Sequence, residues 1–310
     1  MRIIFMGTPD FAVPTLEALV TGGHEVIAAV TQPDKPKGRG KAVLMTPVKE
    51  KALEYGIPVY QPVKAREPEF IEVLKSLEPE VIVVVAFGQI LPKEILEIPR
   101  YGCVNVHASL LPKYRGAAPI QWAVIDGEEE SGVTTMQMDE GLDTGDILEM
   151  EKIRLEEKET GGSLFDKLSR LGGKLILSTL SGLENGTVVP RKQGETTTPY
   201  AKMLKKTMGE IDWNMEAAAI ERLIRGLNPW PSAYTSCNGK TLKIWAADVL
   251  PGGQGEEPGR VRAGKDSLLV ETGSGLLSIT ELQLEGKKRM DTASFLRGFS
   301  ISDGTVLGKG

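Results

Sequence analysis

Two polar side chains stand close together in a segment that reads Cys-Val-Asn-Val-His-Ala-Ser. Successive side chains of a β-strand point to opposite faces, so Asn105 and His107 share one face, and Val104 and Val106 share the other. The valines can be buried in a sheet, and the polar pair comes just before the loop Leu110–Lys113. Ligands of open α/β sheets bind at that edge. The pair is therefore either part of a site or a satisfied polar pair that caps a loop.

An acidic turn with two glycines follows the strand-like run Val133–Met138. The glycines permit a tight turn that aims a carboxylate back toward the polar pair. The spacing of the acids does not fit a calcium-binding loop. Spacing alone does not choose between the four acids of this turn, which are Asp139, Glu140, Asp143 and Asp146.

An asparagine, a histidine and a carboxylate suit acyl transfer to an amine. When the amine attacks a carbonyl-level carbon, the developing oxyanion needs preorganised donors, which an asparagine amide and an imidazolium provide. The attacking nitrogen must also lose a proton. The sequence contains no Gly-x-Ser-x-Gly motif, so direct transfer is favoured over an acyl-enzyme intermediate.

The elements that must position these residues alternate between short apolar runs and amphipathic stretches. This alternation is typical of a Rossmann-like wound, parallel-rich α/β sheet with helices on both faces. Neither a G-x-G-x-x-G after the first strand nor a G-x-x-x-x-G-K-[ST] occurs, which disfavours a dehydrogenase or a P-loop enzyme. We predict strands over 2–6, 24–31, 58–60 and 81–87, and helices that open at residues 8–10 and cover 47–55 and 68–77.

The composition changes beyond residue 186. Residues 187–207 are polar and basic, which is typical of a linker. Residues 208–310 contain one helical stretch, 215–225, and then five short β-like runs separated by turn residues. This spacing predicts a small barrel of the oligonucleotide-binding (OB) type. The expected organisation is a domain over 1–186, a basic linker over 187–207 and a second domain over 208–310.

The overall composition excludes several classes of protein. The chain has 310 residues, 41% hydrophobic and 25% charged, with a net charge of −5. Disordered, collagen-like and disulfide-scaffold chains do not have this balance. The longest apolar run, residues 81–87, is too short to cross a membrane, and the N-terminus lacks a signal-peptide pattern. Cys103 and Cys237 match no metal or redox spacing. We expect a cytoplasmic protein without a metal site.

The motifs together resemble those of the methionyl-tRNA formyltransferases, a family of the folate-dependent formyltransferase superfamily. The likeness runs nearly the whole length of the chain. The Asn-x-His motif and the acidic turn are common to the superfamily, whereas the predicted basic loop over residues 35–41 (KPKGRGK), Asn-Pro-Trp-Pro and the barrel narrow the likeness to the family. The matching stretches are residues 7–12 (GTPDFA), 31–41 (TQPDKPKGRGK), 86–92 (AFGQILP), 105–112 (NVHASLLP), 114–121 (YRGAAPIQ), 141–146 (GLDTGD) and 228–231 (NPWP).

The resemblance implies substrates and site residues. From the resemblance we expect 10-formyltetrahydrofolate as the formyl donor, the α-amine of methionine on initiator tRNA as the acceptor, and a monomeric protein. It implies Asn105, His107 and Asp143 as the catalytic residues, and so selects one of the four acids. The residues it assigns to folate binding are Phe87, Gly88, Gln89, Ile90, Leu91, Ser109, Leu110, Leu111 and Pro112. Those expected to contact tRNA are Lys35, Lys37, Arg39, Lys41, Arg191, Lys192, Lys202, Lys205 and Lys206.

Three other functions fit parts of the sequence. A formyltransferase for a small amine, such as a sugar-nucleotide amine, would share the N-terminal half but would not need the basic loop or the barrel. A formyltetrahydrofolate hydrolase would use water in place of the amine. A non-catalytic tRNA-binding module would have no reason to keep Asn105, His107 and Asp143 together.

Overall fold

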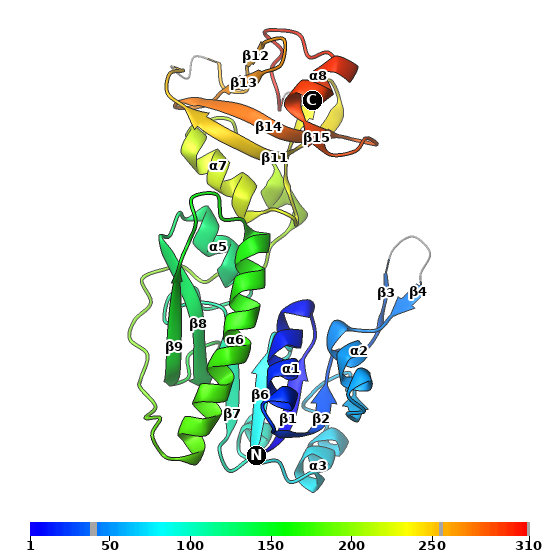
Figure 1. Ribbon diagram of the computed structural model, residues 1–310, viewed down its shortest axis with the longest axis vertical. Helices are drawn as coiled ribbons and strands as arrows, with labels where there is room; N and C mark the ends of the chain where they lie inside the picture. Colours follow the sequence, from blue (N-terminus) through cyan, green and yellow to red (C-terminus); the bar gives the residue numbers. More distant parts are fainter. Residues whose placement is uncertain (38–41, 254–256, 309–310) are drawn as a thin grey trace. The chain divides into compact units, whose positions relative to one another are not determined.

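The computed structural model describes residues 1–37, 42–253 and 257–308, which form two compact units (Figure 1). The first unit comprises Met1–Pro119, Glu130–Arg154 and Phe165–Ala201. The second unit comprises Ile120–Glu129, Leu155–Leu164 and Lys202–Gly310.

A seven-stranded sheet forms the frame of the first unit. Its strands are β1 (Arg2–Gly7), β2 (Glu25–Val30), β5 (Val59–Tyr60), β6 (Val81–Val85), β7 (Cys103–His107), β8 (Glu130–Gln137) and β9 (Ile147–Arg154). They are ordered β5-β2-β1-β6-β7-β8-β9, and the first five run parallel. β8 is antiparallel to β7, and β9 is antiparallel to β8. The predicted Rossmann-like, parallel-rich sheet is therefore confirmed.

Helices cover both faces of this sheet. They are α1 (Val13–Thr21), α2 (Pro47–Glu54), α3 (Pro68–Ser76), α4 (Lys93–Leu96) and α6 (Gly161–Glu184), with a short 3-10 helix, η1 (Asp10–Ala12), before α1. Prolines stand in the first turn of α2 and α3, where the missing N–H costs nothing. On one face α3 and α4 bury Phe70, Leu74 and Ile95 against strand residues.

On the opposite face α6 packs closely against β7 and α1 (Figure 1). Two neighbouring glycines permit this approach. A Cβ on Gly172 would lie 2.8 Å from Cγ1 of Val106, and one on Gly173 would lie 2.9 Å from the carbonyl oxygen of Pro14. Val106 thus points toward α6, so the side chains of Asn105 and His107, which alternate with it, point to the other face.

Two features of the first unit differ from the sequence-based expectations. The predicted loop over 35–41 begins with a strand, because β3 (Lys35–Lys37) pairs antiparallel with β4 (Ala42–Leu44). A Lys-Pro-Lys strand has no apolar alternation, so periodicity could not indicate it. The sequence reading also assigned no element to the long helix α6 or to β9.

The second unit is built on an antiparallel sheet. Its strands are β10 (Ala233–Cys237), β11 (Lys240–Leu250), β12 (Val261–Ala263), β13 (Leu268–Glu271), β14 (Leu276–Leu284) and β15 (Met290–Asp291). The path runs β10-β11-β14-β13-β12, and β15 pairs with β14. Two register shifts between β11 and β14, around Ala246, let the sheet curl into a half-barrel. This confirms the expected small barrel-like second fold.

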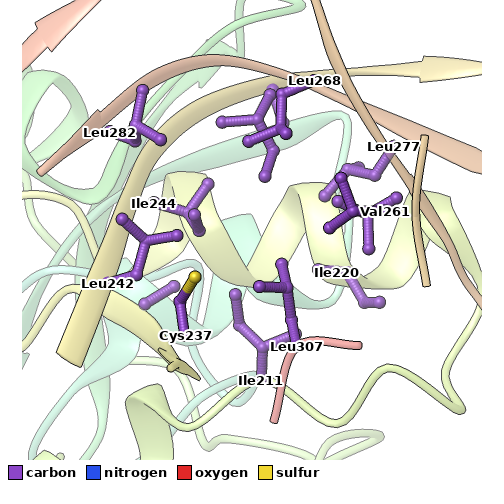
Figure 2. Close-up of a cluster of buried hydrophobic side chains, with 14 of the residues drawn as sticks. Ile211, Ile220, Cys237, Leu242, Ile244, Val261, Leu268, Leu277, Leu282 and Leu307 are labelled. Carbon is purple, nitrogen blue, oxygen red and sulfur yellow. The ribbon is translucent and has the colours of Figure 1, made fainter. Parts of the chain in front are cut away.

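The helices of the second unit are α5 (Pro119–Ile125), α7 (Ala217–Gly226) and α8 (Thr292–Gly298), with a short 3-10 helix, η2 (Lys206–Gly209). The curled sheet closes over α7 (Figure 2). Ile220 and Ile224, one turn apart on α7, are buried with Leu242, Ile244 and Leu277 of the sheet. Across the described parts of both units, no helix is long and apolar enough to cross a membrane.

Candidate active site

The polar pair lies on β7 as its alternation predicts. His107 is 6% exposed, and Asn105 is partly exposed on the same face of the strand. The carboxamide of Asn105 makes no hydrogen bond to any residue that the structure describes. Since a buried or half-buried amide is normally satisfied, this side chain is available to a ligand.

The backbone of the following loop fixes the imidazole of His107. Its Nε2 lies 3.0 Å from the carbonyl oxygen of Tyr114, and because a carbonyl only accepts, Nε2–H must be the donor. Tyr114 has a positive φ of 56°, and its own N–H donates to Oγ1 of Thr198 at 2.7 Å. The other ring nitrogen, Nδ1, lies 3.8 Å from Oδ2 of Asp143.

The acidic loop, residues 138–146, folds back from the end of β8 to bring Asp143 to this place. Oδ2 of Asp143 accepts a hydrogen bond of 2.8 Å from the backbone N–H of Gly116. Gly145 makes the fold-back possible, because a Cβ there would lie 1.7 Å from the carbonyl oxygen of Gln137. The loop is closed at its base by the N–H of Gln137, which donates to the carbonyl of Asp146 at 2.8 Å.

The other three acids of the loop have different surroundings. Asp139 accepts from the N–H of Gly141 at 3.0 Å and from the hydroxyl of Thr144 at 2.8 Å. Asp146 forms an ion pair of 2.9 Å with Lys192. Glu140 is exposed. Asp143 is thus the acid of this loop that the structure brings beside His107, which resolves what spacing left open.

The loop after β7 holds its shape through internal bonds. The hydroxyl of Ser109 donates to the carbonyl of Lys113 at 2.7 Å, and the N–H of Leu111 donates to the hydroxyl of Thr134 at 3.1 Å. Leu111 is buried with Met136. Ser109 and Leu111 therefore brace the loop, while the predicted folate residues Leu110 and Pro112 are partly exposed.

The predicted folate residues after β6 also include both buried side chains and exposed residues. Phe87 and Leu91 are buried in the core of the first unit, and Oε1 of Gln89 accepts from the N–H of Ala65 at 2.6 Å. Gly88 and Ile90 are exposed. Val84 of β6 pairs with Asn105 of β7, so this loop begins at the same edge of the sheet as the polar pair.

The basic residues predicted to contact tRNA are surface residues wherever their side chains are described. Lys35 is exposed and Lys37 lies in β3, whereas Arg39 and Lys41 lie outside the described residues. The remaining exposed ones are Arg191, Lys192, Lys202, Lys205 and Lys206. Lys192 also forms the ion pair with Asp146.

Three residues beside the site received no role in the sequence analysis: Tyr114 and Gly116, which lie in the matching stretch 114–121, and Gln193. Tyr114 and Gly116 act through backbone atoms, which carry no residue-type signal. Gln193 lies in the segment interpreted as a linker and contacts the acidic loop through its side chain. Within residues 1–37, 42–253 and 257–308, no three His, Cys, Asp or Glu side chains are grouped to hold a metal ion.

Comparison with known sequences identifies relatives along the whole chain. Residues 1–180 match the formyl transferase family, and residues 203–300 match the formyl transferase C-terminal domain. Methionyl-tRNA formyltransferase of Lachnospira eligens is 59% identical over 315 residues, covering 100% of both chains. The protein of that name from Agathobacter rectalis is 60% identical over 308 residues, covering 99% of each chain.

Solved structures of lower identity share the fold. WlaRD, a sugar 3N-formyl transferase, superimposes with a TM-score of 0.67 at 18% identity, covering 93% of this chain and 99% of that one. HypX from Aquifex aeolicus, solved with tetrahydrofolic acid, gives a TM-score of 0.63 at 18% identity, covering 99% of this chain and 50% of HypX. At such identities the likeness concerns the fold alone.

Proposed function

This chain belongs to the methionyl-tRNA formyltransferase family, and we propose that Asn105, His107 and Asp143 carry out its formyl transfer. The formyl group of 10-formyltetrahydrofolate moves to the α-amine of methionine on initiator tRNA. One observation supports this assignment above the others. The 3.8 Å approach of Asp143 to Nδ1 of His107 occurs on the same strand face as an Asn105 amide with no partner among the described residues.

The reaction follows from the donors at this face. The neutral amine attacks the formyl carbon, a C–N bond forms, and the carbonyl oxygen becomes an oxyanion. Asn105 and the imidazolium form of His107 donate hydrogen bonds to this oxyanion. Nε2–H of His107 is held by Tyr114, so the donation comes from Nδ1–H. Asp143 beside Nδ1 orients this group and receives the proton that the attacking amine loses, through a water. The bond from the formyl carbon to N10 then breaks, and the released N10 takes up the proton.

The folate is held, in this proposal, by the residues that the two loops leave uncovered. Gly88 and Ile90 after β6, with Leu110 and Pro112 after β7, offer backbone and apolar surface at the edge of the sheet. Phe87, Leu91, Ser109 and Leu111 are buried, and Gln89 bonds to the backbone of Ala65. These five, which the family resemblance also assigns to folate binding, contribute in this proposal by holding the two loops in shape.

The tRNA is held by surface cations of both units. Lys35, Lys37, Arg39 and Lys41 belong to the basic stretch of the sequence over residues 35–41, and the exposed Arg191, Lys192, Lys202, Lys205 and Lys206 follow later in the chain. Neutralising phosphates releases counterions, so binding of tRNA weakens steeply with salt.

The protein acts as a monomer in the cytoplasm.

Formyl transfer to three parallel acceptors tests the function. We expect fast transfer from 10-formyltetrahydrofolate to methionyl initiator tRNA and slow transfer to methionyl elongator tRNA and free methionine. Turnover with a sugar-nucleotide amine but with none of these three would replace the tRNA substrate by a small amine. Release of formate without any acceptor would indicate a hydrolase. Folate-independent tRNA binding without turnover would indicate a binding module.

A further inference from the structure

The connecting segment, residues 187–201, runs along the candidate active site instead of leaving the first unit as a free linker. The backbone of Arg191 pairs with Ile147 at the start of β9 through two hydrogen bonds of 2.8 Å. The N–H of Ala201 donates to the carbonyl of Arg115, also at 2.8 Å. Between these ends, Thr198 binds the N–H of Tyr114, whose carbonyl holds His107.

Gln193 is the one side chain of this segment that bonds to the backbone of Asp143 among the described residues. Its Nε2 donates to the carbonyl of Asp143 at 2.9 Å and to the carbonyl of Gly145 at 2.7 Å. Its Oε1 accepts from Nε and Nη2 of Arg115 at 3.0 and 2.8 Å. Arginine only donates and carbonyls only accept, so the carboxamide has one allowed orientation.

These four bonds link the backbone of the acidic loop to the side chain of Arg115, and these two parts of the chain meet at the Asp143 carboxylate. One stretch is the acidic loop, which carries Asp143 itself. The other contains Arg115, and the next residue, Gly116, donates its N–H to Oδ2 of Asp143. Gln193 therefore bonds directly to the main chain of Asp143. It also bonds to Arg115, the neighbour of the glycine whose N–H binds the Asp143 carboxylate.

We propose that Gln193 is a positioning residue for formyl transfer, which sets the position of the Asp143 carboxylate relative to His107. Asp143 sits at a positive φ of 55°, a conformation that a non-glycine residue adopts only when its surroundings hold it there. Without Gln193 the loop loses its bonds from the connecting segment at the two carbonyls, and the carboxylate is free to shift. This inference rests on the roles proposed above for His107 and Asp143.

A double-mutant cycle between Gln193 and Asp143 tests the proposal. Gln193→Ala is expected to lower kcat by about 10- to 100-fold, because displacement of a catalytic group by about 1 Å costs rates of this order. The KM values for folate and tRNA are expected to change by less than about twofold, because the proposal gives Gln193 a role through Asp143 and no contact with either substrate. In an Asp143→Asn background, Gln193→Ala should cost less than about a further twofold, because it acts through the group already removed.

Two further variants separate positioning from loss of packing. Gln193→Glu keeps the size of the side chain and its contact with Arg115, but it turns an acceptor toward two carbonyls, so it should be at least as slow as Gln193→Ala. Glu195→Ala is the matched control, because Glu195 is exposed and has no partner among the described residues; its kcat should equal that of the parent. The melting temperature of each variant is recorded alongside.

The outcomes distinguish this inference from the proposed function. Full activity of Asp143→Asn would overturn the catalytic assignment itself. A slow Asp143→Asn with a Gln193→Ala of normal kcat would overturn the inference alone. The inference would also be overturned if Gln193→Ala lowered kcat by the same factor in the Asp143→Asn background as in the parent. A residue with a merely structural role would lower kcat equally in both.

Discussion

Nε2–H of His107 donates a hydrogen bond to the carbonyl oxygen of Tyr114, with 3.0 Å between the nitrogen and the oxygen. This bond sets the tautomer of the neutral ring, because it leaves Nδ1 as the nitrogen that faces Asp143 at 3.8 Å. The ring is therefore held from both sides, by a backbone group seven positions along the chain and by the carboxylate of Asp143 beside Nδ1.

The two oxyanion donors are expected to have separable and similar effects. Asn105→Ala and His107→Ala should each lower kcat by about 10²- to 10³-fold, the usual cost of one lost oxyanion donor. Steady-state kinetics with saturating folate and initiator tRNA measures this, with the melting temperature as the control for folding. Near-normal turnover of either folded variant would remove that residue from the mechanism.

Asp143→Asn separates the charge of the carboxylate from its place in the fold. The asparagine oxygen can still accept the hydrogen bond from Gly116, so the melting temperature should stay within about two degrees. The rate should fall by about 10²-fold, the lower end of what a proton-transfer group contributes. A comparison of kcat at one pH with thermal unfolding checks both halves, and a large loss of stability would mean that the charge serves the fold.

Sequence reasoning reached the parts of the site that depend on side-chain alternation. Asn105 and His107 share a face because a strand has a period of two, and that needs no tertiary information. Spacing alone does not choose between Asp143 and Asp146. The family resemblance selects Asp143, and the coordinates give the physical reason, because the loop folds back to bring Asp143 beside His107 and Lys192 binds the other acid. Gln193 could not be found at all, because a polar, basic stretch has the composition of a linker whether or not it packs.

Gly145→Ala is expected to disrupt the acidic loop. A Cβ there would lie 1.7 Å from a backbone oxygen of Gln137, and a backbone atom cannot move aside as a flexible side chain can. We expect a loss of stability of about 1–3 kcal/mol, typical of overpacking, and a fall in kcat as Asp143 moves. Gly194→Ala is the matched control, because nothing lies within 4 Å of a Cβ there. Equal melting temperatures for the two variants would contradict the close approach.

Both cysteines should be inert in the native protein. Burial raises the pKa of Cys103 to about 12 and also raises the pKa of Cys237. The thiolate is the reactive form, and at pH 8 a thiol with a pKa of about 12 is ionised in about one molecule in ten thousand. Iodoacetamide followed by mass spectrometry should label neither cysteine in the folded protein and both in denaturant. Labelling of folded Cys103 at the rate of a free thiol would show that the core opens.

Asp34, directly before β3, gives a pH-dependent contribution to stability. Its carboxylate binds Nζ of Lys49 at 2.5 Å and the carboxamide of Gln61 at 2.7 Å, and these bonds lower the pKa of Asp34 below 3.8. A carboxyl whose pKa is lower in the folded state stabilises the protein above the unfolded pKa, and this contribution is lost as the pH falls through the folded pKa. Asp34→Asn should therefore lower the melting temperature at pH 7, and the gap to the parent should narrow as the pH falls below 3.8. Glu50→Gln on α2, exposed and without a partner among the described residues, is the control, and a gap that stays constant with pH would assign the effect to packing instead of charge.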